Sequence, residues 1–476
     1  MNRRLFSGLL AAALALGGCT RQLGAPQAAP SDAAMLHDAV DQLTSVIVYD
    51  IFSPPQASRA YAYASIAAYE AMRHGDSSYR SMAGQVNGLT PVPAPPAGAM
   101  LSLPLAGVHA FMSVGWSLTF SRARMDSLRA AMDARYEAQL PAETYARSIA
   151  YGDSVAAHIL AWGGNDRFKQ SRGFPKFSVT SNPARWVPTP PAYMDAVEPH
   201  WGSLRPFALD SGGQFRPDPP LPFDTATASP FMAEVREVYE AGRALSDEHR
   251  AITAFWDCNP YVMHAQGHTM FATKKITPGG HWMGIVGIAA RKANADPLRA
   301  AEAYARTAIA LADGFIASWE EKYRSAVIRP ETVINRYLDE RWTPLLQTPP
   351  FPEYTSGHSV ISNAAAVVLT DEFGDDFAFA DSTEMDYGLP VRSFPSFIEA
   401  AEEAAISRLY GGIHYRQAIE QGTAQGRKVG AHVVQRVRTR GEPPLVAARP
   451  RTATDATADA TAGVAMAASS SPAVRR

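Results

Sequence analysis

Three clusters of cationic and histidine side chains in the second half of the chain could bind an oxyanion and move protons. The first runs from Trp319 through Lys322 to Arg329, which precedes a proline. On one helix, Lys322 and Arg329 would lie two turns apart on the same face. Two cations on one face repel each other, and an oxyanion between them relieves that repulsion. This cluster predicts an anion site at the end of a helix.

The second cluster is the segment 348–359, with the sequence TPPFPEYTSGHS. Ser356 is a suitable N-cap for the apolar stretch that follows, and Gly357 lets backbone N–H groups approach a ligand. A helix N-terminus with free N–H groups attracts anions. His358 beside it is placed for proton transfer.

The third cluster is the segment 407–414, SRLYGGIH, which supplies a third cation and a second histidine. Gly411 and Gly412 should break the preceding helix, so that the side chains of Arg408 and His414 can both turn inward. Each cluster by itself is also typical of a solvated helix face or a structural histidine. Their common order along the chain is far more specific.

Lys-x6-Arg-Pro, Ser-Gly-His and Ser-Arg-x5-His, in this order, resemble the three-part signature of the vanadium-dependent haloperoxidases and the related type 2 phosphatidic acid phosphatases. The segments Phe255–Pro260 and Pro278–Trp282 are also similar to bacterial haloperoxidase-like members. The resemblance covers residues 230–440 by motif. It implies an all-α fold, a large helical-bundle domain with long Pro-rich loops.

The resemblance also implies roles for individual side chains. Lys322, Arg329 and Arg408 would neutralise the oxygens of vanadate or phosphate. Ser356 and the amide of Gly357 would bind the same oxygens.

The two histidines would carry the chemistry. His414 would be the ligand to vanadium or, in a phosphatase, the nucleophile, and His358 would be the acid and base. The resemblance thus implies a haloperoxidase with one vanadate per chain as cofactor, acting on hydrogen peroxide, a halide and a small organic substrate, with phosphate as a competing occupant. The alternative is a phosphatase that hydrolyses phosphate monoesters or lipid phosphates through a phosphohistidine.

Three apolar residues favour the haloperoxidase branch. Trp319, Pro349 and Phe351 fall where the family's haloperoxidases place such residues, and an apolar wall there could hold a halide and exclude water. Plain core packing is the alternative. Phe351, where some members carry a histidine, is similar to the chloride-type arrangement; the sequence leaves the halide, the organic substrate and the oligomeric state open.

Two positions depart from the family pattern. Thr355 replaces the usual proline before Ser-Gly-His, and Ala418 replaces an aspartate four residues after His414. The second ring nitrogen of His414 then needs another acceptor, and we expect a backbone carbonyl. This weakens a phosphohistidine nucleophile more than a metal ligand. We expect Asp257 to be the acid partner of Arg408.

Two other classes of function compete with this interpretation. His264 and His268 are four residues apart, and with His281 they could form a zinc site on a helix, although no matching acid or cysteine spacing supports it. The chain could also be a binding scaffold without enzymatic activity. Buried cations without a counter-ion are costly, however, and the complete oxyanion set argues against a scaffold.

The composition is that of a globular protein with a large core. The chain has 476 residues and a formal net charge of -2, which argues against a nucleic-acid partner. Hydrophobic residues make up 46% and charged residues 19%, too apolar for disorder over most of the length. Helical periodicity and Pro or Ser start signals predict helices at about 36–47, 54–69, 101–138, 143–163, 230–257, 297–328, 357–373, 396–410 and 415–438.

Both ends of the chain differ from this core. A basic start, a short apolar run over residues 5–16 and the sequence LGGC at 16–19 resemble a bacterial lipoprotein signal. We therefore expect a signal peptide (1–18), a lipidated tether (19–34) with the lipid on Cys19, a helical domain (35–440) and a disordered Ala/Thr-rich tail (441–476). Lipid on Cys19 would leave Cys258 without a disulfide partner. The predicted location is the periplasmic face of the outer membrane, held by that lipid; ordinary secretion or a soluble periplasmic protein is the alternative.

Overall fold

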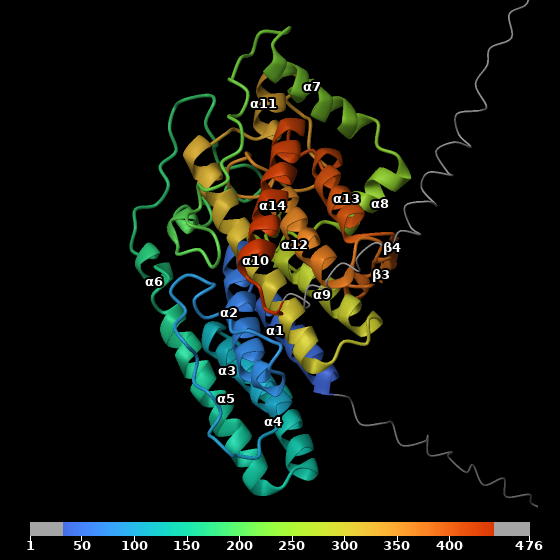
Figure 1. The fold of residues 1–476 in the computed structure, drawn as a ribbon. Coiled ribbons are helices and arrows are strands. Elements are labelled where there is room, and N and C mark those ends of the chain that lie inside the picture. The colour runs from blue at the N-terminus through green and yellow to red at the C-terminus, as the bar shows by residue number, and fades with distance from the viewer. Residues whose placement is uncertain (1–31, 442–476) are drawn as a thin grey trace, which may run out of the picture.

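The computed structural model describes residues 32–441 (Figure 1). The predicted signal peptide, Cys19 and the Ala/Thr-rich stretch from 442 onward lie outside the described residues. The first helix begins at Asp32, so the last three residues of the expected tether are helical.

The described part of the chain folds into helices, with two short antiparallel β-hairpins between them. The α-helices are α1 (Asp32–Tyr49), α2 (Pro54–Met72), α3 (Leu103–Leu118), α4 (Arg122–Gln139), α5 (Ala142–Gly163), α6 (Phe168–Ser171), α7 (Pro230–Arg243), α8 (Asp247–Phe255), α9 (Pro278–Lys292), α10 (Pro297–Ser325), α11 (Pro330–Tyr337), α12 (Gly357–Phe373), α13 (Phe397–Tyr410) and α14 (Arg416–Arg436). The 3-10 helices are η1 (Arg73–Gly75), η2 (Trp201–Ser203) and η3 (Met385–Tyr387). Strands β1 (Val262–Gln266) and β2 (Thr269–Thr273) form one hairpin, and β3 (Phe379–Asp381) and β4 (Arg392–Phe394) form the other. The predicted all-α fold is confirmed.

Several predicted helix boundaries are wrong for local reasons. The stretch 101–138 divides at Ser121, where two consecutive backbone N–H groups donate to the carboxylate of Asp50 and turn the chain. The stretch 230–257 divides at Ser246, which caps α8 by accepting the N–H of His249. Helix α10 ends at Ser325, not at residue 328, because Ala326 has a left-handed backbone.

Helix α10 forms the centre of the molecule and packs against α2 on one side and α12 on the other (Figure 1). Nearly every residue from Ala300 to Trp319 is buried, and many of them are alanine. Small side chains let neighbouring helices approach closely, and a helix buried all round is typical of a large core. The last turns of α10 carry Trp319 and Lys322 into the site described below.

Close packing between α12 and α14 fixes the start of α12. A Cβ on Gly426 would lie 2.2 Å from the carbonyl oxygen of Val360, and one on Gly430 would lie 2.6 Å from that of Ala364. Only glycine allows the two backbones to approach this closely. The N–H of Ser356 also donates to a carbonyl in the first turn of α14, at 3.0 Å. Ser356–His358 are therefore held rigidly against α14.

One buried carboxylate on α10 anchors a long connection. Asp313 accepts the backbone N–H groups of Phe207, Ala208 and Leu209 at 2.7, 2.7 and 2.9 Å. Burial raises the pKa of Asp313 to about 6, although these hydrogen bonds oppose the shift.

None of the helices within residues 32–441 combines the length and the apolar character that a membrane-spanning helix needs.

Candidate active site

A pocket with a volume of about 40 Å³ lies where the ends of α8, α10, α12 and α13 meet. A water molecule needs only ~10–15 Å³ by this kind of measure, so the pocket admits small reactants. Its lining includes seven predicted residues, namely Trp319, Pro349, Phe351, Gly357, His358, Arg408 and His414. Lys322, Arg329 and Ser356 are buried directly behind that lining. The structure thus brings the three sequence clusters to one place.

Lys322 lies in the last turn of α10 and holds the loop that precedes α12. Its Nζ donates to the carbonyl oxygens of Pro352, Glu353 and Thr355 at 3.1, 3.0 and 2.5 Å. Burial, reinforced by the charge of Arg329, holds the pKa of Lys322 well below its ordinary value. The three N–H groups of the ammonium are all used by these carbonyls. Lys322 therefore adds positive charge and fixes the loop.

The spacing predicts that Lys322 and Arg329 share one helix, and this prediction is wrong. Arg329 lies beyond the end of α10 and immediately precedes α11. Its Nε donates to the carbonyl of Phe351 at 3.0 Å, and Nη1 lies 2.8 Å from the carbonyl of Ile413 and 3.1 Å from His414 Nε2. Burial lowers the pKa of Arg329 to about 10. Its Nη2 is buried and has no hydrogen-bond partner in the described part of the chain. A buried donor of this kind is costly unless a ligand accepts from it.

Arg408 ends α13 and reaches the pocket from the opposite side. Its Nε donates to Ser407 Oγ at 2.9 Å, and Nη2 donates to the carbonyl of Trp256 at 2.7 Å. The expectation that Asp257 is its direct acid partner is wrong, because Asp257 pairs with Lys275 at 2.8 Å. Burial lowers the pKa of Arg408, and the charge of Asp257 opposes that shift only through space.

His414 follows the predicted break at Gly411 and Gly412, where α13 ends. Its Nδ1 lies 2.7 Å from Glu353 Oε1, so the acceptor is a carboxylate, and the prediction of a backbone carbonyl is wrong. Arg329 can only donate, so Nε2 must accept from it and the proton of the neutral ring sits on Nδ1. Burial and the charges of Arg329 and Lys322 hold the pKa of His414 well below its ordinary value. A neutral ring with a lone pair on Nε2 is the form that binds a metal.

Glu353 is the functional residue that the sequence interpretation missed. It also accepts the backbone N–H of Tyr415 at 3.0 Å, and burial raises its pKa to about 8 while Arg329 and Lys322 oppose that rise. Glu353 accepts the hydrogen bond from His414 Nδ1 that an aspartate at position 418 would otherwise accept. A signal was present, since Glu353 is the single acidic residue in the segment 348–359.

If His414 holds vanadate, as the resemblance implies, substitution of Glu353 should weaken vanadate binding. Outer partners of metal-binding histidines are worth about 10–100-fold in affinity. We expect Glu353→Ala to lose about 100-fold and Glu353→Gln only about 10-fold, because a glutamine oxygen still accepts from Nδ1. Equilibrium dialysis with vanadium analysis measures both. Glu234→Gln, which removes a carboxylate that bonds Gln417, is the control, and an equal loss there would count against the role of Glu353.

Ser356 caps α12 as predicted. Its Oγ accepts the backbone N–H and the hydroxyl of Ser359 at 3.3 and 2.9 Å. His358 stands in the first turn, hydrogen-bonds the backbone of Trp256, and has its pKa held well below the ordinary value by burial and by Arg408. His358 Nε2 is buried without a partner among residues 32–441. The ring is therefore neutral and has one nitrogen left for a reactant.

The aromatic residues both line the pocket and pack on its cations. The rings of Trp319 and Phe351 lie 4.9 Å apart, and Lys322 Nζ is 5.3 Å from the centre of the Phe351 ring. The guanidinium of Arg329 is 5.2 Å from the same ring. Phe351 is 9% exposed. Trp319 and Phe351 therefore pack in the core and form the wall of the pocket at the same time.

The alternative of a zinc site formed by His264, His268 and His281, which the sequence did not favour, is ruled out by their positions. His264 is an exposed residue of strand β1, where it bonds Thr273, and His268 is in the turn that follows. His281 is buried in the first turn of α9. In the described ranges, the group compatible with a metal joins His281 to Cys258 and Glu384 instead.

The chain is similar to known proteins over most of its length. The family model for the second helical-bundle domain of VCPO matches residues 302–442. The solved structure of a protein described as the first bacterial vanadium-dependent iodoperoxidase is 50% identical, with a TM-score of 0.82, and the match covers 86% of this chain and 98% of that one. No curated protein matched the sequence.

A bacterial vanadium-dependent chloroperoxidase, solved in holo and apo forms, is more distant. Its holo form is 18% identical with a TM-score of 0.60 over 82% of this chain and 94% of that one. Its apo form is 19% identical with a TM-score of 0.59 over 79% and 92%. At these identities the likeness concerns the fold. With 50% sequence identity to the iodoperoxidase over 86% of this chain, the protein belongs to the family of bacterial vanadium-dependent haloperoxidases.

Proposed function

We propose that the chain oxidises iodide with hydrogen peroxide, using vanadate bound in the pocket between α10, α12 and α13. The observation that carries this proposal is a neutral His414 Nε2 beside two buried guanidinium groups, those of Arg329 and Arg408. A buried positive field beside an unprotonated imidazole nitrogen fits an oxyanion whose metal also takes a nitrogen ligand. The relative that is 50% identical is described as an iodoperoxidase, which favours iodide over chloride despite the chloride-type residue Phe351.

The residues present fit vanadate. The orphaned Nη2 of Arg329 is a donor for one of its oxygens, and Gly357 at the start of α12 lines the same pocket. Arg408 would supply a second guanidinium, Ser356 would orient the α12 backbone, and His414 Nε2 would hold the metal. Bound vanadate would supply the electrophilic activation of peroxide that halide oxidation requires.

Other side chains would handle protons and exclude water. His358 is neutral with a free Nε2, so it would accept the proton of incoming hydrogen peroxide and return it to the leaving oxygen. Trp319 and Phe351 would give the polarisable iodide an apolar surface beside the cations.

The reason first given for disfavouring a phosphohistidine does not hold. Ala418 lacks a carboxylate, but Glu353 supplies one to His414 Nδ1. The geometry of His414 therefore serves either reaction, and the choice of the peroxidase branch is supported by the similarity to the iodoperoxidase.

Two assays on the purified mature chain test whether it is a peroxidase or a phosphatase. With vanadate, peroxide and iodide we expect triiodide to form, more slowly with bromide. Hydrolysis of p-nitrophenyl phosphate by the vanadate-free protein should stay near background. Rapid ester hydrolysis, with no halide oxidation at any vanadate concentration, would contradict the assignment.

We also propose that the mature protein is an exported lipoprotein, on the strength of LGGC at 16–19. Thr20, not aspartate, follows Cys19, which favours the outer membrane. Stable anchoring needs more than one acyl chain, since each buried methylene contributes about 0.8 kcal/mol.

The anchor is tested by labelling cells with a fatty acid analogue. Wild type should be labelled and should fractionate with membranes. Cys19→Ser should lose the label and should not mature normally, but its helical domain should still fold. An unlabelled wild-type chain in the soluble fraction only would refute the anchor.

A further inference from the structure

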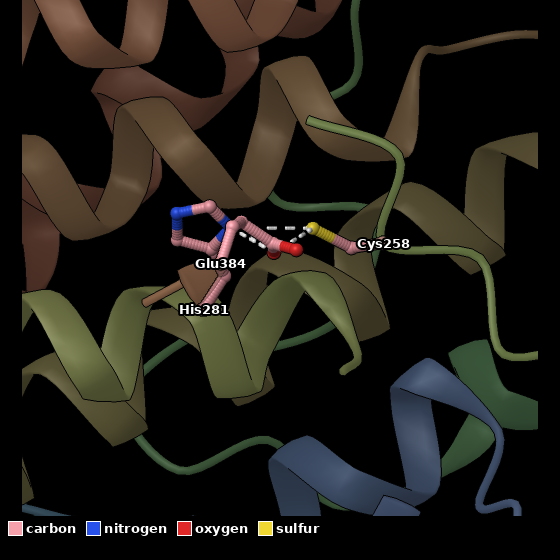
Figure 2. A group of neighbouring side chains, drawn as sticks. All are labelled: Cys258, His281 and Glu384. Carbon is pink, nitrogen blue, oxygen red and sulfur yellow. Dashed lines mark hydrogen bonds and ion pairs between the residues drawn. The ribbon is translucent and has the colours of Figure 1, made fainter. Parts of the chain in front are cut away.

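Behind the active-site pocket, three potential metal ligands from separate segments meet in the interior (Figure 2). Cys258 follows α8, His281 is in the first turn of α9, and Glu384 directly precedes η3. His281 Nδ1 lies 3.0 Å from Glu384 Oε1 and 3.3 Å from Cys258 Sγ, and Sγ lies 3.8 Å from Oε1. All three residues are buried.

These separations match the edges of a coordination tetrahedron. With zinc bonds of ~2.0–2.3 Å to nitrogen, oxygen and sulfur, tetrahedral angles put the ligand atoms about 3.4–3.6 Å apart. The three measured distances fall within a few tenths of an ångström of those values. A mixed set of imidazole, thiolate and carboxylate is typical of zinc. Three protein ligands leave one position for water.

A carboxylate bonds the second ring nitrogen of His281, as is usual for a histidine that binds a metal. Its Nε2 lies 2.8 Å from Asp381 Oδ2, and Asp381 Oδ1 accepts the backbone N–H and hydroxyl of Thr383 at 3.0 and 2.7 Å. This carboxylate directs the lone pair of Nδ1 toward Cys258 and Glu384.

The local charge also calls for a cation. Asp381 and Glu384 are both buried and both pair with His281, at 2.8 and 3.0 Å, and among residues 32–441 neither forms an ion pair with a lysine or arginine. A protonated His281 would offset only one of the two negative charges. A second buried carboxylate without a compensating charge is expensive. We propose that Cys258, His281 and Glu384 bind one zinc ion, with Asp381 orienting His281.

The zinc site would support the pocket from behind. The ring of His281 stacks on Trp256 with centres 4.6 Å apart, and Cys258 is two residues further along and lines the pocket itself. The carbonyl of Trp256 accepts from Arg408, and its backbone also bonds His358. Zinc would therefore fix the segment that positions these two side chains.

The test is the metal content of the untagged full chain, purified without chelator and measured by plasma mass spectrometry. We expect about one zinc per wild-type chain and at least a tenfold lower content in Cys258→Ser/Glu384→Gln. His264→Ala/His268→Ala, which removes two exposed histidines, is the matched control and should keep its zinc. The readout needs no vanadate, peroxide or halide, so it is independent of the proposed function.

Two further measurements guard against a variant that fails to fold. Cobalt exchanged into wild type should give the thiolate-to-cobalt absorption of a Cys ligand. Asp381→Asn keeps all three ligands and should weaken zinc binding about 10–100-fold.

A proton on Nδ1, shared between His281 and Glu384, would satisfy the same atoms without a metal. Wild type that carries no zinc and takes up none when one equivalent is offered would establish that arrangement and overturn the proposal. Equal zinc content in Cys258→Ser/Glu384→Gln would overturn it as well.

Discussion

Replacement of His414 by alanine is expected to abolish tight vanadate binding, with a rise in Kd of more than ~100-fold. Loss of an outer partner alone costs about 10–100-fold, so loss of the ligand itself must cost more. The residual attraction would come from Arg329, Arg408 and Lys322, which also attract phosphate. Equilibrium dialysis at constant ionic strength measures the change.

Two comparisons make this result specific. Phosphate, which takes no nitrogen ligand, should bind His414→Ala within a few-fold of wild type. His358→Ala should keep its vanadate affinity. An equal loss of vanadate affinity in the His414 and His358 variants would show that the two roles are wrongly assigned.

Replacement of His358 by alanine is expected to lower kcat by ~10²–10⁴-fold, the usual value of a positioned acid and base. The vanadate-loaded variant should still bind halide, because Trp319 and Phe351 are untouched. Steady-state iodide oxidation at saturating vanadate measures the loss.

The pH profile provides the control for that result. The pKa of His358 is held below its ordinary value by burial and by Arg408, so the active neutral ring persists at neutral pH. Wild-type kcat should fall as pH drops through this lowered pKa, and the fall should disappear in His358→Ala. An unchanged acid limb in the variant would assign the proton transfer to another group.

The parts of the site that neighbouring residues determine were predictable. Ser356 caps α12 because the residues after it form an apolar helix, and Gly411–Gly412 end α13 because glycine tolerates the required turn. These local signals fixed the positions of His358, Arg408 and His414 along the chain.

The parts that depend on tertiary contacts were not predictable. Glu353 reaches His414 across 61 residues, and the three carbonyls around Lys322 come from a loop about 30 residues away. No pattern in the sequence specifies such pairs. Helix α9 escaped prediction as well, since Pro-Gly-Gly at its start resembles a turn and its buried surface gives no clear amphipathic period.

The most direct test of the central claim is a vanadate titration of the metal-free mature chain with iodide oxidation as the readout. The account predicts no activity without vanadate, a linear rise up to one equivalent per chain, and a rightward shift of the curve when phosphate is added, because phosphate competes for Arg329 and Arg408. Iodide oxidation that is absent at saturating vanadate, or that does not depend on vanadate at all, would contradict it.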